Sequence, residues 1–301
     1  MEMPNYEATS FSSIVKEIPV IDLGEDRTVV ARQLVKALEE YGFFQDANRH
    51  VGRMCILVQF CVSLSAHLCT QSWRSAEAKL NGIYVKQDEL ELKYDIMMKQ
   101  VTNHGVPEDL MDEAMEVEVI SAYSTEVRML SMIIFDLVSK GLGLEAGYFG
   151  KEHKQKMIVH HFLVCPDPSS TLGMDGHCDP NLITIYQQKV YGLQILKNEE
   201  WIGVEPLPHA FVFNFGLPIM VMTNGKLENV AHRVVPNTTQ TCTGIGIYFS
   251  PANIVEPAKS FVGPDNPPLF KPFKWDTEFF PHYANKKLVY HAALEAFKIY
   301  A

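Results

Sequence analysis

Apolar residues near the start of the chain follow two different periods. Residues 18–23, IPVIDL, form a short apolar run that predicts a buried strand. Residues 26–44 repeat apolar positions every three to four residues, which predicts an amphipathic helix. The next stretch, 46–100, fits neither pattern, because it begins polar, becomes abruptly apolar with three of the six cysteines, and ends in mixed charge.

Regular patterns resume after this stretch with a strand and two helices. Residues 101–107, VTNHGVP, predict a strand and a turn, because Gly-Val-Pro interrupts regular structure. A helix is expected to begin near Glu108. A second, strongly amphipathic helix is expected over 123–149, closed by Gly141 and Gly143.

The character of the chain changes from about residue 155 onward. Short β-rich runs are separated by Gly, Pro, Asn and Asp turns, which is typical of an antiparallel sandwich, jelly roll or barrel. The runs are KMIVHHFLV, NLITIYQQ, GLQIL, WIGVEPL, AFVFNFG, MVMTNG, AHRVV and GIGIYFS. Residues 285–300 predict a final helix. We expect a mainly β protein with helices: a helical N-terminal region at 1–150, a β-core at 151–254, and a C-terminal segment with a helix at 255–301.

Composition and charge limit the classes of partner. The 301-residue chain is 47% hydrophobic and 21% charged, which is ordinary for a globular protein. Its net charge is −10 and it has no run of Lys or Arg, so we expect neither nucleic acid nor a membrane as a partner. The most apolar stretch, 55–69, is too short to span a bilayer. No secretory signal is evident and the cysteines lack regular spacing, which predicts a cytoplasmic protein with reduced thiols. We expect a monomer with a small-molecule substrate.

Residues 171–183, TLGMDGHCDPNLI, contain the first candidate metal ligands along the chain. Strand side chains alternate, so His177 and Asp179 are expected to project to one side and Cys178 to the other. On its own, such a pair is better explained as a polar loop between strands. His232, in NVAHRVVPN, can supply a third ligand from another strand. Two histidines and one carboxylate on one face of an ion leave open positions for a co-substrate and dioxygen, which suits non-haem Fe(II).

A set of motifs occurs in order along most of the chain outside 46–100. They are IPVIDL, YGFF, NHGVP, HCDPNLITI, YGLQILKNEEWIGVEPLPHAFVFNFG, TNGKLENVAHRVV and SPANIVEPAKSFV. Together they resemble the plant 2-oxoglutarate/Fe(II)-dependent dioxygenases, closest to the hyoscyamine-hydroxylase-like and flavonoid-oxidising branch. The resemblance implies a double-stranded β-helix (jelly-roll) core, with His177, Asp179 and His232 as iron ligands. It also implies 2-oxoglutarate and O2 as co-substrates.

The positions that contact 2-oxoglutarate in this family are changed. The family places an Arg ten residues after the last iron histidine, followed two residues later by a Ser, and these positions are Cys242 and Gly244. The family also has an Asn-x-Tyr-Pro motif before Cys-Pro, where His160, Phe162 and Leu163 stand. A guanidinium pairs with a buried carboxylate through two hydrogen bonds, which neither Cys nor Gly can replace. We therefore expect weaker binding of the co-substrate.

Four basic or imidazole side chains are candidates to compensate for the missing Arg. Arg233 is the nearest basic residue in sequence, and Lys197 lies in the same β-rich region. His160 and His161 could each donate one hydrogen bond. Nothing in the sequence places any of them in the pocket.

The scaffold also departs from the family at two junctions. In the family YGFF runs almost directly into NHGVP, so residues 46–100 are an insertion, and a helical stretch is missing near 117–120. An insertion at one junction and a deletion at another indicate an alternatively or wrongly spliced transcript. We expect a transcript that reads continuously from Gln45 to Val101. Finding residues 46–100 in every transcript would contradict this interpretation.

Three functional hypotheses follow. The first is an Fe(II), 2-oxoglutarate-dependent dioxygenase that hydroxylates or desaturates a small specialised metabolite, with impaired co-substrate binding. The second is a metal-binding pseudoenzyme that keeps the ion but lacks the Arg/Ser anchor. The third is a cupin-like metalloprotein that uses Zn or Mn in non-oxidative chemistry, and the ordered motifs disfavour it.

Overall fold

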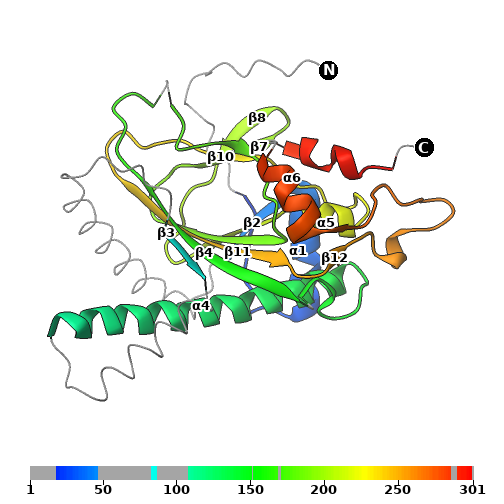
Figure 1. The fold of residues 1–301 in the computed structure, drawn as a ribbon, viewed down its shortest axis with the longest axis horizontal. Helices are drawn as coiled ribbons and strands as arrows, with labels where there is room; N and C mark the ends of the chain where they lie inside the picture. Colours follow the sequence, from blue (N-terminus) through cyan, green and yellow to red (C-terminus); the bar gives the residue numbers. More distant parts are fainter. Residues whose placement is uncertain are drawn as a thin grey trace.

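Two β-sheets form the centre of the protein (Figure 1). The computed structural model describes residues 18–46, 83–86, 108–150, 152–168, 171–285 and 290–299. The larger sheet consists of β1 (Val20–Ile21), β2 (Phe43–Asp46), β9 (Phe211–Phe215), β6 (Ile183–Gln188), β11 (Cys242–Pro251), β4 (His153–Phe162) and β3 (Ile83–Lys86), in that spatial order. The smaller sheet consists of β5 (Met174–His177), β10 (His232–Val234), β7 (Leu193–Lys197) and β8 (Glu200–Gly203). A further pair joins β12 (Ile254–Val255) to β13 (Phe273–Lys274).

The pairing of the strands is almost entirely antiparallel. β11 pairs with β4, which has the same length, on one side and with β6 on the other. β1 pairs with β2 in the parallel sense. Residues of both sheets line one pocket, so the two sheets face each other across it. This architecture confirms the prediction of a mainly β protein with helices.

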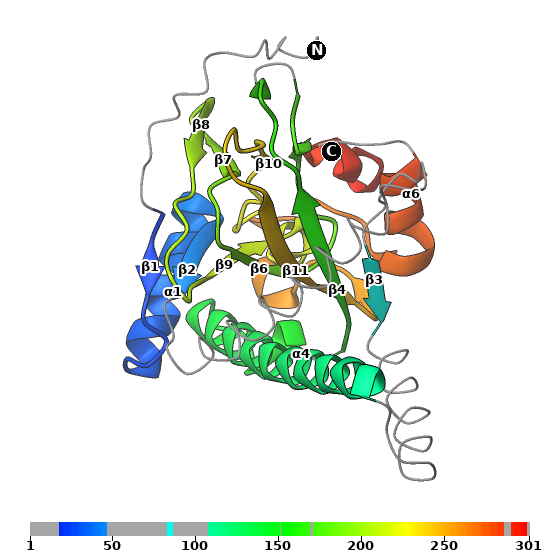
Figure 2. The ribbon, with the colours of Figure 1, turned by 90° about the vertical axis from the view of Figure 1, so that its left-hand side faces the viewer.

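Two long helices cover the outer face of the larger sheet (Figure 2). They are α1 (Arg27–Tyr41) and α4 (Glu108–Gly141). Their buried side chains form one cluster with the sheet, which includes Leu34 of α1, Val127 of α4 and Phe213 of β9. α4 ends at Gly141, where an added Cβ atom would lie 2.7 Å from the carbonyl oxygen of Ala31, so a glycine permits the close approach of the two helices.

The first predicted helix is shorter than expected. Asp26 caps the N-terminus of α1 by accepting a hydrogen bond from the Thr28 backbone N–H at 2.9 Å. The helix ends at Tyr41 because Gly42 adopts φ +64°, a left-handed conformation that stops a helix. Within the YGFF motif, Tyr41 ends the helix and the two phenylalanines begin β2, which brings Phe43 to the pocket.

The two helices expected around residues 108–149 form one continuous helix. α4 begins at Glu108 as predicted, but it runs through residues 117–123 without a break and ends at Gly141 instead of at 149. No Gly or Pro occurs between Glu108 and Gly141, so nothing in the sequence interrupts the helix. The short η1 (Tyr148–Gly150) follows it.

Two predictions in the second half of the chain need correction. MVMTNG was expected as a strand, but it contributes to the helix α5 (Leu217–Met222) and the turn that follows. Pro218 in the first turn of α5 favours a helix start, since its missing N–H is not needed there. The expected final helix is a short 3-10 helix, η5 (Tyr290–Phe297), preceded by η3 (Lys259–Phe261), η4 (Trp275–Phe279) and α6 (Phe280–Asn285).

Some sequence predictions lie outside the described residues. These are the strand and turn at 101–107 and most of the segment 46–100, of which Asp46 and β3 are described. β3 pairs with β4 at the edge of the larger sheet. Among the described residues, no helix is both long and apolar enough to cross a membrane.

Candidate metal centre

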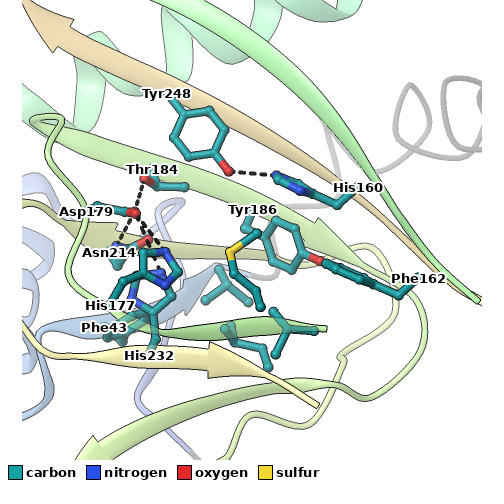
Figure 3. A pocket seen from close by; sticks show the side chains of 14 residues that line it. Phe43, His160, Phe162, His177, Asp179, Thr184, Tyr186, Asn214, His232 and Tyr248 are labelled. Carbon is teal, nitrogen blue, oxygen red and sulfur yellow. Dashed lines mark hydrogen bonds and ion pairs between the residues drawn. The ribbon is translucent and has the colours of Figure 1, made fainter. Parts of the chain in front are cut away.

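His177, Asp179 and His232 meet at the wall of the pocket between the two sheets (Figure 3). His177 ends β5 and His232 begins β10, and the two residues are direct partners in the register of these strands. Nε2 of His177 lies 3.5 Å from Oδ1 of Asp179, and Nε2 of His232 lies 3.6 Å from the same oxygen. The three potential ligand atoms all lie within 4.8 Å of one another. The described residues contain no second such cluster of His, Cys, Asp or Glu.

The opposite directions expected for Cys178 and its neighbours are observed, although β5 ends at His177. Cys178 is buried in a separate apolar cluster that includes Leu217 and Phe279, while Asp179 lines the pocket. The two residues after His177 belong to a short loop, and their side chains still point in alternate directions. The side chain of Asp179 is 5% exposed, and those of His177 and His232 are 19% and 10% exposed.

Neighbouring side chains fix the Asp179 carboxylate. Its Oδ2 accepts hydrogen bonds from Oγ1 of Thr184 and from Nδ2 of Asn214, the latter at 2.9 Å. Nδ2 of Asn181 in turn donates to Oγ1 of Thr184 at 2.9 Å. With Oδ2 held in this way, Oδ1 faces the two histidines. Such outer hydrogen bonds orient a ligand and are usually needed for tight metal binding.

The imidazole rings are also oriented. Nδ1 of His177 forms a hydrogen bond with the carbonyl oxygen of Asp175 at 2.8 Å, which leaves Nε2 toward Asp179. The ring of His232 packs edge-on against Phe43 with ring centroids 5.4 Å apart. The two imidazole centroids lie 4.3 Å from each other.

The pKa shifts of Asp179 and His232 favour the protonation states that bind a metal ion, whereas the shift of His177 favours its protonated form. Burial, reinforced by the neighbouring His177, lowers the pKa of His232 to about 4. Burial opposes ionisation of Asp179, but His232 and His177 hold the pKa of its carboxyl well below the usual range. Burial also lowers the pKa of His177, but the hydrogen bond and charge of Asp179 raise it above its ordinary value overall. An ionised carboxylate beside a neutral imidazole is the form in which these groups bind a metal ion.

Distant segments anchor the loop that carries Asp179. The indole Nε1 of Trp275 donates to the carbonyl oxygen of Pro180 at 2.6 Å, and the hydroxyl of Tyr283 donates to that of Cys178 at 3.1 Å. The backbone N–H of Leu217 donates to the carbonyl oxygen of Asp179 at 2.8 Å. Trp275 packs beside Phe280 while it holds this loop.

The pocket beside the cluster has about 430 Å³ of space, counting its opening to solvent. Its apolar lining residues are Phe43, Phe162, Met174, Leu193, Val212 and Val234. Its polar lining residues outside the cluster are His160, Thr184, Tyr186, Asn214 and Tyr248. The described lining contains no Lys or Arg, so apart from Asp179 and the histidines the walls carry no ionisable group that is charged near neutral pH.

The four changed co-substrate positions lie together on two adjacent strands. In the register of β4 and β11, Phe162 is opposite Cys242 and His160 is opposite Gly244. His160 and Phe162 line the pocket, and the thiol of buried Cys242 donates to the carbonyl oxygen of Val190 at 3.4 Å. Leu163, the fifth changed position, has 62% of its surface exposed.

None of the candidates considered from the sequence brings a positive charge to the pocket. The Arg233 guanidinium stacks 4.2 Å from the centre of the Trp201 ring and donates to Gln194, and the Lys197 ammonium lies 3.3 Å from the centre of the Tyr41 ring. His160 forms a hydrogen bond with the Tyr248 hydroxyl at 2.8 Å, and burial lowers the pKa of His160 to about 4.

His161, the remaining candidate, lies outside the described lining and forms a hydrogen bond with Thr243.

The donor set of His177, Asp179 and His232 fits a divalent metal ion. The described walls do not provide a charged partner for the distal carboxylate of 2-oxoglutarate.

Sequence reasoning identified the three cluster residues but missed their surroundings. Thr184 and Tyr186 occupy alternate positions along β6. Asn214 is the single polar residue in the otherwise apolar run AFVFNFG, and such a residue was the available sequence signal for a polar contact in the pocket. Tyr248 and Phe43 carry no such signal, because aromatic residues in strands usually pack in the core.

Comparison with known proteins places this geometry in a family. Residues 153–245 match the sequence model of the 2OG-Fe(II) oxygenase superfamily. Hyoscyamine 6-dioxygenase of Hyoscyamus niger is 35% identical over 94% of this chain and 90% of its own length. The chain belongs to the 2OG-Fe(II) oxygenase superfamily. Flavanone 3-dioxygenase 2 of Oryza sativa subsp. japonica is 29% identical over 93% of this chain and 87% of its own length.

The superfamily assignment is supported by a solved structure. The crystal structure of JOX2 in complex with 2OG, Fe and JA superposes with a TM-score of 0.70, at 25% identity, over 91% of this chain and 88% of that one. The predicted jelly-roll core is therefore confirmed. Fe(II) and 2-oxoglutarate are the cofactor and co-substrate of this 2OG-Fe(II) oxygenase family.

Removing one hydrogen bond to Asp179 tests the role of Thr184. We expect Thr184→Val, which keeps the size of the side chain, to weaken Fe(II) binding by ~10–100-fold, because one partner that orients the carboxylate is lost. Thr125→Val is a matched control, since Thr125 is exposed on α4 and its hydroxyl bonds the Ser121 carbonyl. Equal Fe(II) affinities of the two variants, measured by anaerobic titration, would contradict this role.

Proposed function

We propose that His177, Asp179 and His232 bind Fe(II), and that the protein is an Fe(II)- and 2-oxo-acid-dependent oxygenase of a small specialised metabolite. The observation that carries the proposal is the approach of two imidazole Nε2 atoms to one carboxylate oxygen, at 3.5 and 3.6 Å, on the wall of a pocket. Two histidines and one carboxylate on one face of an iron leave its other positions open. The bound iron would supply the activation of dioxygen for hydroxylation or desaturation.

The side chains around the cluster have defined tasks in this proposal. Thr184 and Asn214 orient the Asp179 carboxylate through hydrogen bonds to its Oδ2. Phe43, Met174 and Leu193 provide an apolar wall that positions an organic substrate and limits access of water. The relatives named for hyoscyamine and flavanone support a small organic molecule as the substrate class.

A metal-binding pseudoenzyme is the second candidate. It is favoured by one observation, the absence of Lys and Arg from the described lining at the end of the pocket where Cys242 and Gly244 replace the family's Arg and Ser. In that case the protein would bind Fe(II) without turnover.

Product analysis separates the two candidates. The purified protein is incubated with Fe(II), a panel of 2-oxo acids and a panel of small plant metabolites, and the products are analysed by mass spectrometry. The first candidate predicts Fe(II)-dependent gain of one oxygen atom or loss of two hydrogen atoms by one metabolite. Fe(II) binding without dioxygen consumption under any of these conditions would favour the pseudoenzyme.

A pair of histidine variants controls this experiment. We expect His232→Asn to abolish both Fe(II) binding and turnover, and His209→Asn to change neither. His209 is exposed and has φ +63°, a conformation that Asn tolerates, so this control keeps the backbone. Turnover that survives in His232→Asn would refute the proposed iron site.

The proposal also includes a monomeric protein in the cytoplasm, without nucleic acid as a partner. The net charge of −10 and the absence of Lys or Arg runs support the exclusion of nucleic acid. Size-exclusion chromatography with light scattering is expected to give the 34.1 kDa mass of one chain. A mass of two chains would contradict the monomer.

A further inference from the structure

Tyr186 lines the pocket and covers Gly244. A Cβ atom added to Gly244 would collide with the hydroxyl oxygen of Tyr186, so the Tyr186 ring can lie there because residue 244 has no side chain. Gly246 has the same relation to Tyr248, whose hydroxyl oxygen would lie 2.6 Å from an added Cβ atom. Tyrosine rings thus occupy the space that side chains at positions 244 and 246 of β11 would need.

One further carboxylate neutralises the net charge of the proposed metal site. A bound Fe(II) brings two positive charges and Asp179 one negative charge, so the carboxylate of a single 2-oxo acid group completes neutrality. A second carboxylate would enter a pocket whose described lining contains no Lys or Arg. Arg233 and Lys197 are engaged with Trp201 and Tyr41. Burial of a carboxylate without a cationic partner is strongly unfavourable.

The rest of the pocket suits an apolar group. Phe162, Met174, Leu193 and Val234 belong to its described lining. Figure 3 shows Tyr186 and Phe162 on the opposite side of the pocket from the histidine cluster. Two polar side chains of the lining are paired with each other, since His160 bonds the Tyr248 hydroxyl at 2.8 Å.

We propose that this pocket selects a 2-oxo acid with one carboxylate and an apolar tail over 2-oxoglutarate. The inference rests on the proposed function, because it requires Fe(II) at the histidine cluster. The 2-oxo acid group lies at the metal, and the apolar tail lies against Tyr186 and Phe162. The lack of a cationic side chain in the described lining determines this preference. Tyr186 maintains it, because its ring fills the region that a side chain at position 244 would need for a hydrogen bond to a distal carboxylate.

A pair of co-substrates of matched shape tests the preference. In 5-methyl-2-oxohexanoate an isopropyl group replaces the distal carboxylate of 2-oxoglutarate. Each acid is titrated into the Fe(II)-loaded protein without oxygen, and binding is followed by calorimetry and by the metal-to-ligand charge-transfer band. We expect 5-methyl-2-oxohexanoate to bind at least about tenfold more tightly than 2-oxoglutarate, because the latter buries an unpaired charge.

Variants of the pocket test the role of Tyr186. The triple variant Tyr186→Leu, Cys242→Arg, Gly244→Ser is expected to reverse the preference to 2-oxoglutarate. The double variant Cys242→Arg, Gly244→Ser keeps the Tyr186 ring and is expected not to gain 2-oxoglutarate binding. The single variant Tyr186→Leu, which adds no charge, is expected to keep the preference for the apolar tail, and circular dichroism checks the fold of each variant.

The outcomes separate this inference from the proposed function. A protein that does not bind Fe(II) overturns the proposed function and this inference with it. Binding of Fe(II) together with equal or tighter binding of 2-oxoglutarate overturns the inference alone. Binding of Fe(II) with no charge-transfer band for either acid also overturns it and favours the pseudoenzyme. If the multiple variants fail to fold, the comparison of the two acids in the unaltered protein still decides.

Discussion

Asp179→Asn is expected to lower the Fe(II) affinity of the protein by more than about 100-fold, because loss of a partner that merely orients a ligand already costs ~10–100-fold. Asp179 contributes the carboxylate oxygen nearest to both imidazoles, and its side chain is almost fully buried. An amide has no negative charge to offset the ion. Fe(II) should therefore raise the melting temperature of the unaltered protein and leave that of the variant unchanged.

Asp276→Asn is the matched control for this change. Asp276 is a half-exposed carboxylate that pairs with Lys154 at 3.4 Å on the surface. Its replacement should leave Fe(II) affinity and the Fe(II)-dependent thermal shift as they are. A thermal shift that persists in Asp179→Asn, or disappears in Asp276→Asn, would show that the metal binds elsewhere.

Gly216→Ala is expected to lower the free energy of unfolding by about 3 kcal/mol, the upper end for an overpacked site, and to weaken Fe(II) binding. A Cβ atom at Gly216 would collide with the carbonyl oxygen of Asn181 and lie 2.7 Å from that of Asp179. Both atoms are backbone, so the loop that carries Asp179 must move to relieve the clash. Denaturant unfolding and Fe(II) titration measure the two effects.

Gly263→Ala provides the comparison for this substitution. No heavy atom lies within 4 Å of a Cβ added to Gly263, so the same chemical change should have little effect there. Equal stability of the two variants would contradict the close approach of Gly216 to the metal loop. Loss of stability in Gly216→Ala without loss of Fe(II) affinity would show that the loop adapts.

The proposed metal ligands and the changed co-substrate positions belong to different parts of the fold. His177 and His232 pair in the smaller sheet, and Asp179 follows in the adjoining loop. The changed positions lie on β4 and β11 of the larger sheet, where Cys242 pairs with Phe162 and Gly244 with His160. Substitutions on β4 and β11 can therefore alter the co-substrate end of the pocket while the metal end keeps its geometry.

The cluster of possible ligands could be predicted because its signal is local. His177 and Asp179 are two residues apart, and side-chain alternation places them together even though β5 ends at His177. His232 required the further assumption that its strand pairs with β5, which the order of the family motifs supported. The register of β5 and β10 shows these two histidines as direct partners.

The remaining features depend on contacts that sequence spacing does not reveal. Tyr186 of β6 approaches residue 244 of β11 so closely that a side chain at that position would collide with it. The hydrogen bond from Trp275 to Pro180 likewise joins residues that are far apart in the chain. The run MVMTNG reads as a strand from its apolar residues, but Pro218 and its position after β9 place it in a helix. Tertiary contacts of this kind override the local secondary-structure propensity of a segment.

Anomalous diffraction at the iron absorption edge from crystals grown with Fe(II) tests the central claim most directly. We expect one strong iron peak per chain, within bonding distance of Nε2 of His177, Nε2 of His232 and Oδ1 of Asp179. A peak at any other site, or no peak at this cluster in protein that binds Fe(II) in solution, would contradict it.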